Sequence, residues 1–231
     1  MSKRRLSIGV ILVVLLTAAA FAADGEEYTL IFKNQSTMVG DVCIYQHDPD
    51  MGMQDVMSVA WFAKGAAPTT RLTFRWSIDY CFVWGEVGKL ASGIVFEAAQ
   101  TWEADLQTLN AITLTRIHGD IYTFADQRAG AYAGNLYIYS VGTIPSGEVA
   151  VGIGMSGRPT YVTNAQPNWE WVFTPTPAYW ITFGTFEPGE ALDVESISRK
   201  AAIVFPDGVY SMTAILHENN TWTVTPTQEA D

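Results

Sequence analysis

Positive charge is scarce in this chain of 231 residues. Lys and Arg together number 13, against 24 Asp and Glu, which gives a formal net charge of −11 at pH 7. A nucleic-acid-binding protein needs a basic face that displaces counterions from phosphate. The composition therefore argues against nucleic acid as a partner, and equally against adhesion to an anionic membrane by charge.

Long apolar runs are also missing, apart from one near the N-terminus. Residues 6–16 are nearly all apolar, they follow a basic start at residues 3–5, and the small residues Ala20 and Ala22 come shortly after. The run is too short to cross about 30 Å of hydrocarbon. We therefore expect residues 1–22 to be a signal peptide, no transmembrane anchor, and a mature protein that is secreted or periplasmic.

Cysteine is nearly absent, since Cys43 and Cys81 are the two in the chain. Two cysteines cannot by themselves supply the usual four-ligand zinc site. Outside the cytosol a disulfide between them can persist. A Cys43–Cys81 bridge and a pair of buried thiols therefore both stay open at this point.

The residues that are abundant predict an all-β fold. Aromatic and β-branched residues recur with period two between turns rich in Gly, Pro, Asn and Asp. In residues 74–84 one face carries Phe74, Trp76, Ile78, Tyr80, Phe82 and Trp84. This predicts one long strand, or two with a bend, that buries a wall of aromatic side chains. The best helical candidate is the segment 98–109. Further strands are predicted at residues 28–32, 41–45, 111–115, 136–139, 149–153, 169–173, 201–205 and 222–225.

The chain also repeats itself. Phe74, Tyr80 and Gly85 return in the same order as Phe173, Tyr179 and Gly184, and Gly40-Asp41-Val42 is echoed by Gly147-Glu148-Val149. A further block, residues 104–114, is echoed by residues 214–224. We therefore expect two homologous antiparallel β-sandwich-like units of about 100 residues, 23–130 and 131–231, with one larger sandwich built from both halves as the alternative.

Five short runs point to a family. They are FVWG (82–85), WEADL (102–106), VGIGMSG (151–157), AQPN (165–168) and YWITFG (179–184). These runs resemble the RhiA-like proteins, which are named for expression in the rhizosphere of nodulating bacteria. The resemblance implies a setting in which a bacterium meets a plant or another host surface, and it brings no catalytic chemistry with it.

One string matches a nucleotide-binding motif. Gly152, Gly154 and Gly157 have the spacing of the dinucleotide fingerprint, which needs a helix directly behind it. Residues 158–162 (RPTYV) cannot open such a helix. We therefore interpret the run as a strand that ends in a glycine-rich turn.

A polar, methionine-rich loop at residues 47–57 offers two sets of metal ligands. Hard oxygens for calcium are those of Asp48, Asp50 and Asp55. A softer set that suits copper is His47 with Met51, Met53 and Met57. Because the late bidentate Glu of an EF-hand is missing, the favoured interpretation is a solvated connection, with calcium and copper as alternatives and no cofactor expected.

Catalytic patterns are weak throughout the chain. The histidines are His47, His118 and His217, and no Gly-x-Ser-x-Gly elbow is present. Glu97, Glu103 and Asp105 lie close in sequence and could include a glycosidase-like carboxylate pair, but sequence cannot show two carboxylates facing each other across a cleft. We expect a protein without enzymatic activity and keep an enzyme with an unrecognised site as one alternative.

Tryptophan is the remaining signal, with 8 in the chain. Strand phase assigns most of them to the core: Trp76, Trp84, Trp169, Trp171 and Trp222. Trp180 falls on the opposite face, and Trp61 and Trp102 have no assignment. These three are the candidate ligand-binding residues, because exposed tryptophan stacks on sugar rings. We expect a binding protein at a cell surface or host interface with carbohydrate as its leading ligand, and a membrane-active or pore-forming protein as the alternative.

Overall fold

The chain is built from strands. The computed structural model describes residues 26–47, 55–119 and 121–228, which form seventeen β-strands and no helix. The predicted all-β fold is confirmed. Within the described residues, accordingly, no helix is long and apolar enough to cross a membrane. The predicted signal peptide lies outside this part of the chain.

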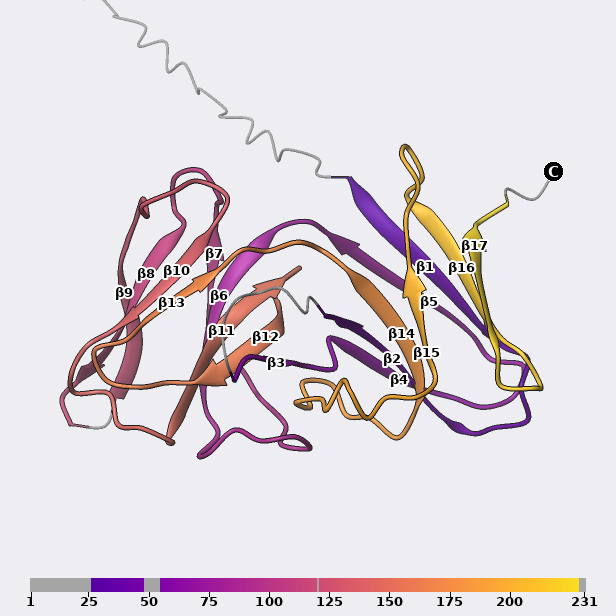
Figure 1. Ribbon diagram of the computed structural model, residues 1–231, viewed down its shortest axis with the longest axis horizontal. Helices are drawn as coiled ribbons and strands as arrows, with labels where there is room; N and C mark the ends of the chain where they lie inside the picture. Colours follow the sequence, from indigo (N-terminus) through magenta and orange to yellow (C-terminus); the bar gives the residue numbers. More distant parts are fainter. Residues whose placement is uncertain (1–25, 48–54, 120, 229–231) are drawn as a thin grey trace, which may run out of the picture.

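The strands form four sheets, and the sheets pair into two lobes (Figure 1). The first lobe, on the right in Figure 1, contains sheets β17-β16-β1-β5 and β15-β14-β2-β4. Its strands are β1 (Glu27–Asn34), β2 (Gly40–Gln46), β4 (Phe62–Ala66), β5 (Arg71–Ser77), β14 (Tyr179–Gly184), β15 (Lys200–Ile203), β16 (Ser211–Leu216) and β17 (Trp222–Pro226). The second lobe contains sheets β3-β12-β11-β6-β7 and β13-β10-β8-β9. Its strands are β3 (Met57–Ser58), β6 (Tyr80–Glu86), β7 (Gln100–Ala104), β8 (Ala111–Ile117), β9 (Ile121–Arg128), β10 (Leu136–Ser140), β11 (Val149–Met155), β12 (Arg158–Asn164) and β13 (Glu170–Phe173).

Each lobe encloses its own hydrophobic core between its two sheets. In the first lobe, Leu30 and Phe32 of β1 meet Ile44 of β2 and Ile181 of β14, and all four are fully buried. In the second lobe, the inward residues of β6 and β11 meet those of β8, β10 and β13. Alternate residues of these strands point inward, so the period-two pattern of the sequence generates both cores.

The two lobes do not correspond to the two halves of the sequence. Every sheet combines strands from both sides of residue 130, since β1 pairs with β16, β2 with β14, β6 with β11 and β8 with β10. The division into units 23–130 and 131–231 therefore does not describe the lobes. The chain visits the second lobe briefly at β3, leaves the first lobe after β5 and returns to it after β13, so each half contributes strands to both lobes.

The repeat nevertheless has a structural counterpart. Reading β1–β9 against β10–β17, with β3 as an addition, gives sheets of the same order, because β17-β16-β1-β5 corresponds to β9-β8-β10-β13. The parallel pairs correspond as well, β1 with β16 and β10 with β8. Phe74 and Phe173 thus lie on equivalent strands. The match of residues 104–114 with 214–224 is wrong by one strand, because Ile112 lies on β8, the equivalent of β16, whereas Trp222 lies on β17.

The long aromatic run at residues 74–84 contributes side chains to both cores. It breaks at Ile78 and Asp79 into β5 and β6, and this break is the passage between the lobes. Phe74 and Trp76 lie in the core of the first lobe, and Phe82 and Trp84 in that of the second. Ile78, which the pattern placed in the core, is 44% exposed at the passage.

Two local predictions have clear outcomes. The helical candidate at residues 98–109 is wrong, because Gln100–Ala104 form β7, whose residues alternate between exposed and half-buried along the edge of β6. The glycine-rich run is a strand and turn, as expected. Gly157 and Ser156 both have positive φ in the tight turn between β11 and β12, which suits a type I′ hairpin.

The two lobes are joined by hydrogen bonds between the loop segments that connect their strands. The backbone N–H of Ala60 donates to the carbonyl of Glu190 at 2.8 Å, and that of Phe96 donates to the carbonyl of Gly189 at 2.9 Å. The Trp61 indole Nε1 donates to the Met155 carbonyl at 3.0 Å, which ties the first core to the end of β11. These contacts fix the two lobes against each other.

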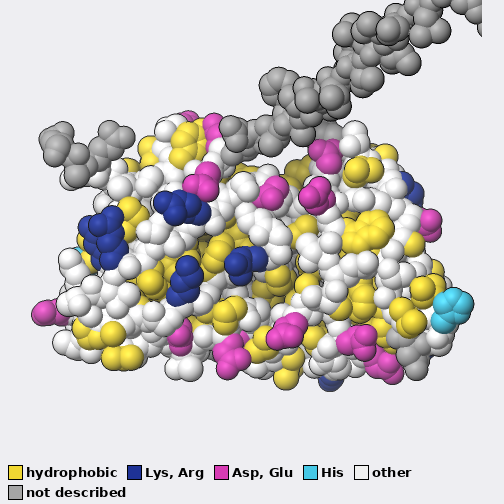
Figure 2. Space-filling view, turned by 180° about the vertical axis from the view of Figure 1, so that it is seen from behind, with side chains coloured by type: hydrophobic (Ala, Val, Ile, Leu, Met, Phe, Trp, Pro, Cys, Tyr) yellow, Lys and Arg dark blue, Asp and Glu magenta, His cyan; other side chains and the backbone are white. Residues whose placement is uncertain are grey.

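Basic side chains are unevenly distributed over the lobes. Six of those in the described residues lie in the first lobe: Lys33, Lys64, Arg71, Arg75, Arg199 and Lys200. Figure 2 shows Lys and Arg side chains gathered on the half of this face that the first lobe forms, at the left of the view. The other four in the described residues, Lys89, Arg116, Arg128 and Arg158, lie in the second lobe.

Candidate functional site

The three candidate tryptophans have different surroundings. Trp61, predicted as a ligand-binding residue, is 2% exposed and packs in the core of the first lobe, so its ring presents no open face to a ligand in this structure. Trp102 is half-buried on β7 and packs edge-on against Phe124 at 6.4 Å between ring centroids. Trp180 is half-buried on β14 and points away from the core of its lobe. Trp180 is therefore the candidate that combines an outward position with accessible surface.

Trp180 is held by contacts on the outer face of its sheet. Like Phe186, Val194 and Ile197 of the loop after β14, it packs against a buried cluster of Cys43, Tyr45, Ala60 and Leu192. The Lys200 ammonium lies 5.6 Å from the centre of the indole ring and also donates to the Val194 carbonyl at 2.9 Å. This cation–π contact fixes the orientation of the ring.

An aromatic groove opens beside Trp180, at the end of β14 where the passages between the lobes leave. Its volume is about 540 Å³, and Tyr28, Tyr179 and Phe205 supply the other aromatic walls. Tyr28 meets Phe205 edge-on at 4.9 Å, so these walls support one another. The rim is aliphatic, with Ile78 44% and Val204 68% exposed. We call this cavity the aromatic groove.

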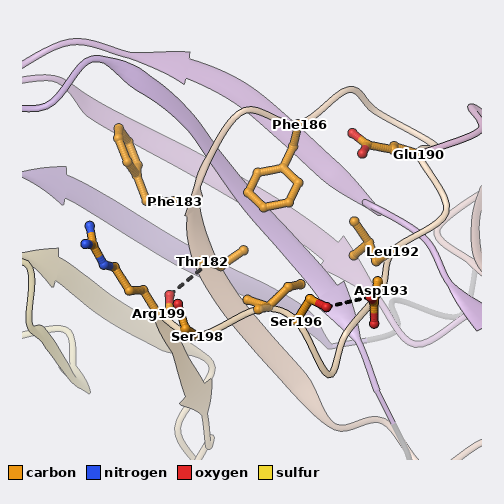
Figure 3. A pocket seen from close by; sticks show the side chains of 10 residues that line it. Thr182, Phe183, Phe186, Glu190, Leu192, Asp193, Ser196, Ser198 and Arg199 are labelled. Atoms are coloured by element: carbon orange, nitrogen blue, oxygen red, sulfur yellow. Dashed lines mark hydrogen bonds between the residues drawn. The ribbon is translucent and has the colours of Figure 1, made fainter. Parts of the chain in front are cut away.

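A second cavity lies further along β14, under the loop that follows it. Its volume is about 430 Å³, and Figure 3 shows Phe186, Glu190 and Asp193 on one side of it and Arg199 beside Phe183 on the other. The Thr182 hydroxyl donates to the Arg199 carbonyl at 2.9 Å, and the Ser196 hydroxyl donates to the Asp193 carboxylate at 2.5 Å. An aromatic wall is thus combined with hydrogen-bond donors and acceptors. We call this cavity the polar pocket.

The two cavities are neighbours along β14 and β15. Trp180 pairs with Ala202 at the aromatic groove, and Thr182 pairs with Lys200 at the polar pocket. Residues two apart on a strand are separated by about 7 Å. Lys200 lines neither cavity and follows Arg199 of the polar pocket. We call the two neighbouring cavities together the track, with aromatic surface at one end and polar groups at the other.

The equivalent strand of the second lobe carries no tryptophan at the position of Trp180. Tyr179 and Tyr80 open the equivalent strands β14 and β6, so Cys81 occupies the position of Trp180. Cys81 is 3% exposed and belongs to a small apolar cluster. Because the same fold forms with a buried cysteine at this position, the fold itself does not require Trp180.

Most of the predicted metal ligands lie outside the described residues, namely Asp48, Asp50, Met51 and Met53. His47 is half-buried directly after β2, and its backbone N–H donates to the Ala178 carbonyl at 3.2 Å. Asp55 is exposed with φ of 65°. Among the residues that can be described, no three His, Cys, Asp or Glu side chains group as metal ligands.

The two cysteines are free and buried. Cys43 lies on the outer face of β2 with Tyr45, Ala60 and Leu192, whereas Cys81 lies in a different cluster with Val59. Of the two interpretations that the sequence left open, the structure shows the pair of buried thiols. Burial, aided by the negative charge of Asp79, raises the pKa of Cys81 to about 12, and burial also raises the pKa of Cys43.

Of the candidate catalytic carboxylates, Asp105 lies in a turn and Glu103 lies on an exposed strand. Asp105 accepts hydrogen bonds from the backbone N–H groups of Gln107 and Thr108 and from the Thr108 hydroxyl. These bonds close the turn between β7 and β8, and they lower the pKa of the Asp105 carboxyl. Glu103 is exposed on β7. The Asp105 carboxylate is thus occupied by hydrogen bonds that stabilise the turn.

Sequence reasoning missed most of the track. Tyr28 lies far along the chain from Arg199, Lys200 and Phe205, and only the pairing of β14 with β15 brings Arg199 and Lys200 beside Trp180. Alternation indicated that Trp180 faces outward. No local signal indicated which residues would surround it.

These features define an all-β protein of two interlocked lobes with a track of aromatic and polar cavities on one of them. A family model for RhiA matches residues 25–227. The chain is 35% identical over 211 residues to Protein RhiA of Rhizobium leguminosarum bv. viciae, covering 90% of each chain. The chain therefore belongs to the RhiA family, as its sequence runs suggested. No solved structure matches it.

Proposed function

We propose that this protein is exported and binds carbohydrate, without turning it over, at a cell surface or host interface. The observation that carries the proposal is the outward Trp180, which Lys200 fixes at the aromatic groove, next to the polar pocket. Ligand sites combine apolar and aromatic walls with a few placed polar groups, and this track has both. The basic and apolar start of the chain supports export.

The chemistry of the track suits a short oligosaccharide. The apolar face of a sugar ring stacks on an indole, whereas its hydroxyl groups both donate and accept hydrogen bonds. Trp180 supplies the stacking surface. In the polar pocket, Glu190 and Asp193 supply acceptors and Arg199 supplies donors, all three from the loop between β14 and β15. An extended ligand would therefore occupy both cavities.

A glycan array probed with residues 23–231 tests the proposal, comparing the wild type with Trp180→Ala. We expect retention of a defined set of glycans and a loss of affinity of roughly tenfold to a hundredfold in the variant, the range of an aromatic hot spot. Trp169→Ala is the matched control, because Trp169 is 52% exposed on the second lobe and should leave binding unchanged.

Two outcomes would contradict the proposal. One is an array that retains nothing, in which case liposome leakage becomes the next test, since Ile78 and Val204 give the groove an aliphatic rim. The other is an equal loss of affinity in Trp180→Ala and Trp169→Ala, which would show that the track is not the binding surface.

A further inference from the structure

Two cations face each other across a strand pair of the first lobe. Lys33 on β1 and Arg71 on β5 are directly opposite in the antiparallel register. Arg71 is exposed and Lys33 is half-buried. Like charges placed directly opposite on a sheet repel each other and destabilise the pair. The protein thus keeps an unfavourable arrangement at this position.

Among the described residues, no carboxylate forms a salt bridge with Lys33 or Arg71. Within residues 26–47, 55–119 and 121–228 there is one salt bridge, and it joins Arg75 to Glu27 at 3.3 Å. Arg75 lies on the same strand as Arg71, four residues further along, so the same face shows how a cation on β5 is neutralised by a residue of β1. Lys33 and Arg71 form no such bridge.

The two cations line a cavity of about 480 Å³ with Asn34, Gln35, Thr69 and Thr70. All six lining residues are polar or basic, and none is acidic. Backbone hydrogen bonds fix the walls, because Asn34 N–H donates to the Thr70 carbonyl and Thr69 N–H to the Asn34 carbonyl. The Asn34 side chain is 1% exposed and donates to the Ala67 carbonyl at 3.1 Å, which anchors the loop that carries Thr69.

The equivalent pair in the second lobe carries no cation. The register of β10 with β13 places Tyr139 opposite Glu170, at the positions that correspond to Lys33 and Arg71. Equivalent strands therefore pair without two basic residues. The cations are a feature of this cavity and not a requirement of the fold.

We propose that this cavity binds an oxyanion group, a sulfate, phosphate or carboxylate. The guanidinium of Arg71 presents a planar fork of donors that matches such oxygens, the ammonium of Lys33 adds a second charge, and the Thr69 and Thr70 hydroxyls supply neutral donors. A bound anion also removes the repulsion between the two cations. This site lies apart from the β14–β15 track and does not depend on the carbohydrate proposal.

The test is a titration of residues 23–231 with sodium sulfate, sodium phosphate and sodium acetate, each at ionic strength held constant with sodium chloride. Backbone amide shifts and isothermal calorimetry report binding. We expect saturable shifts centred on residues 33–35 and 69–71, and at least a tenfold loss of affinity in both Arg71→Gln and Lys33→Gln. Arg75→Gln is the control and should keep the wild-type affinity, because Arg75 is paired with Glu27.

Folding failure does not confuse this test, since removing either cation relieves a repulsion and should leave the protein at least as stable without added anion. Comparison of free sulfate with a sulfated oligosaccharide, and of acetate with an oligouronate, separates a small-ion site from one that recognises a charged glycan. Shifts no larger than those of chloride, or unchanged affinity in Arg71→Gln, would overturn the proposal.

Discussion

At the residue scale, Cys43 and Cys81 are buried on the outer faces of two different sheets. Burial raises the pKa of both thiols, that of Cys81 to about 12, so almost no thiolate forms near neutral pH. We predict that the folded protein at pH 8 reacts with Ellman's reagent far more slowly than a free thiol does. In denaturant, two equivalents should react. A count of zero in denaturant without reductant would show a disulfide and contradict the structure.

The tryptophans show what residue patterns can and cannot predict. Alternation correctly placed Trp76, Trp84 and Trp171 in cores and Trp180 on an outer face. It failed for Trp169, which is 52% exposed, because this residue precedes β13 and does not follow the strand's alternation. Strand phase holds only within a strand, and the exact ends of strands are set by tertiary contacts.

At the scale of elements, the close approach of β11 to β12 depends on glycine. A Cβ added at Gly152 would lie 1.9 Å from the Tyr161 carbonyl oxygen and 2.8 Å from the Val162 Cα, both backbone atoms. We predict that Gly152→Ala destabilises the protein by about 1–3 kcal/mol or more, the usual cost of overpacking. This corresponds to a fall in Tm of roughly 2–12 °C for a chain of this size.

The matched control for this glycine is Gly65→Ala. At Gly65 on the edge strand β4, the nearest atom to an added Cβ is the Asp41 Oδ1 at 3.7 Å, an ordinary contact. Thermal unfolding of this variant should stay within about 0.5 kcal/mol of the wild type. Equal losses of stability in both variants would contradict this account, because the loss at Gly152 would then not come from the close approach of β11 to β12.

Most strands were predictable because their signal is local. The period-two pattern and the turn residues located β1, β2, β8, β10, β11 and β17 to within a few residues. Residues 98–109 were misassigned because β7 is a short edge strand, on which Thr101 and Glu103 face solvent and leave little apolar alternation. Edge strands are specified by their neighbour, and sequence patterns carry little of that information.

At the scale of the whole molecule, the exchange of strands between the halves makes each half incomplete. Residues 23–130 contain β1 without β16, β2 without β14, and β6 without β11. What remains is a set of two-stranded pairs, which are marginal in water. We predict that this fragment as a monomer lacks the near-UV circular dichroism of packed aromatic residues. It should regain that signal when refolded with residues 131–231.

A monomeric fragment 23–130 with native-like near-UV signal would contradict the interlocked arrangement. The sequence repeat predicted two related units, and the order of strands in the sheets reflects that relation. It could not show that β6–β9 and β14–β17 change places, because a strand pairs equally well with a partner from its own half or from the other. The short connections at Ile78 and before Tyr179 carry the chain into the other lobe, and with it the strands that follow.

The central functional claim is that the track along β14 and β15 holds the ligand. Backbone amide shift mapping of residues 23–231, with an oligosaccharide that the array retains, tests it most directly. We predict that the largest shifts fall at residues 179–183 and 199–205, and that Trp180→Ala removes them. Shifts centred on the second lobe, or shifts at the track that persist in Trp180→Ala, would contradict the claim.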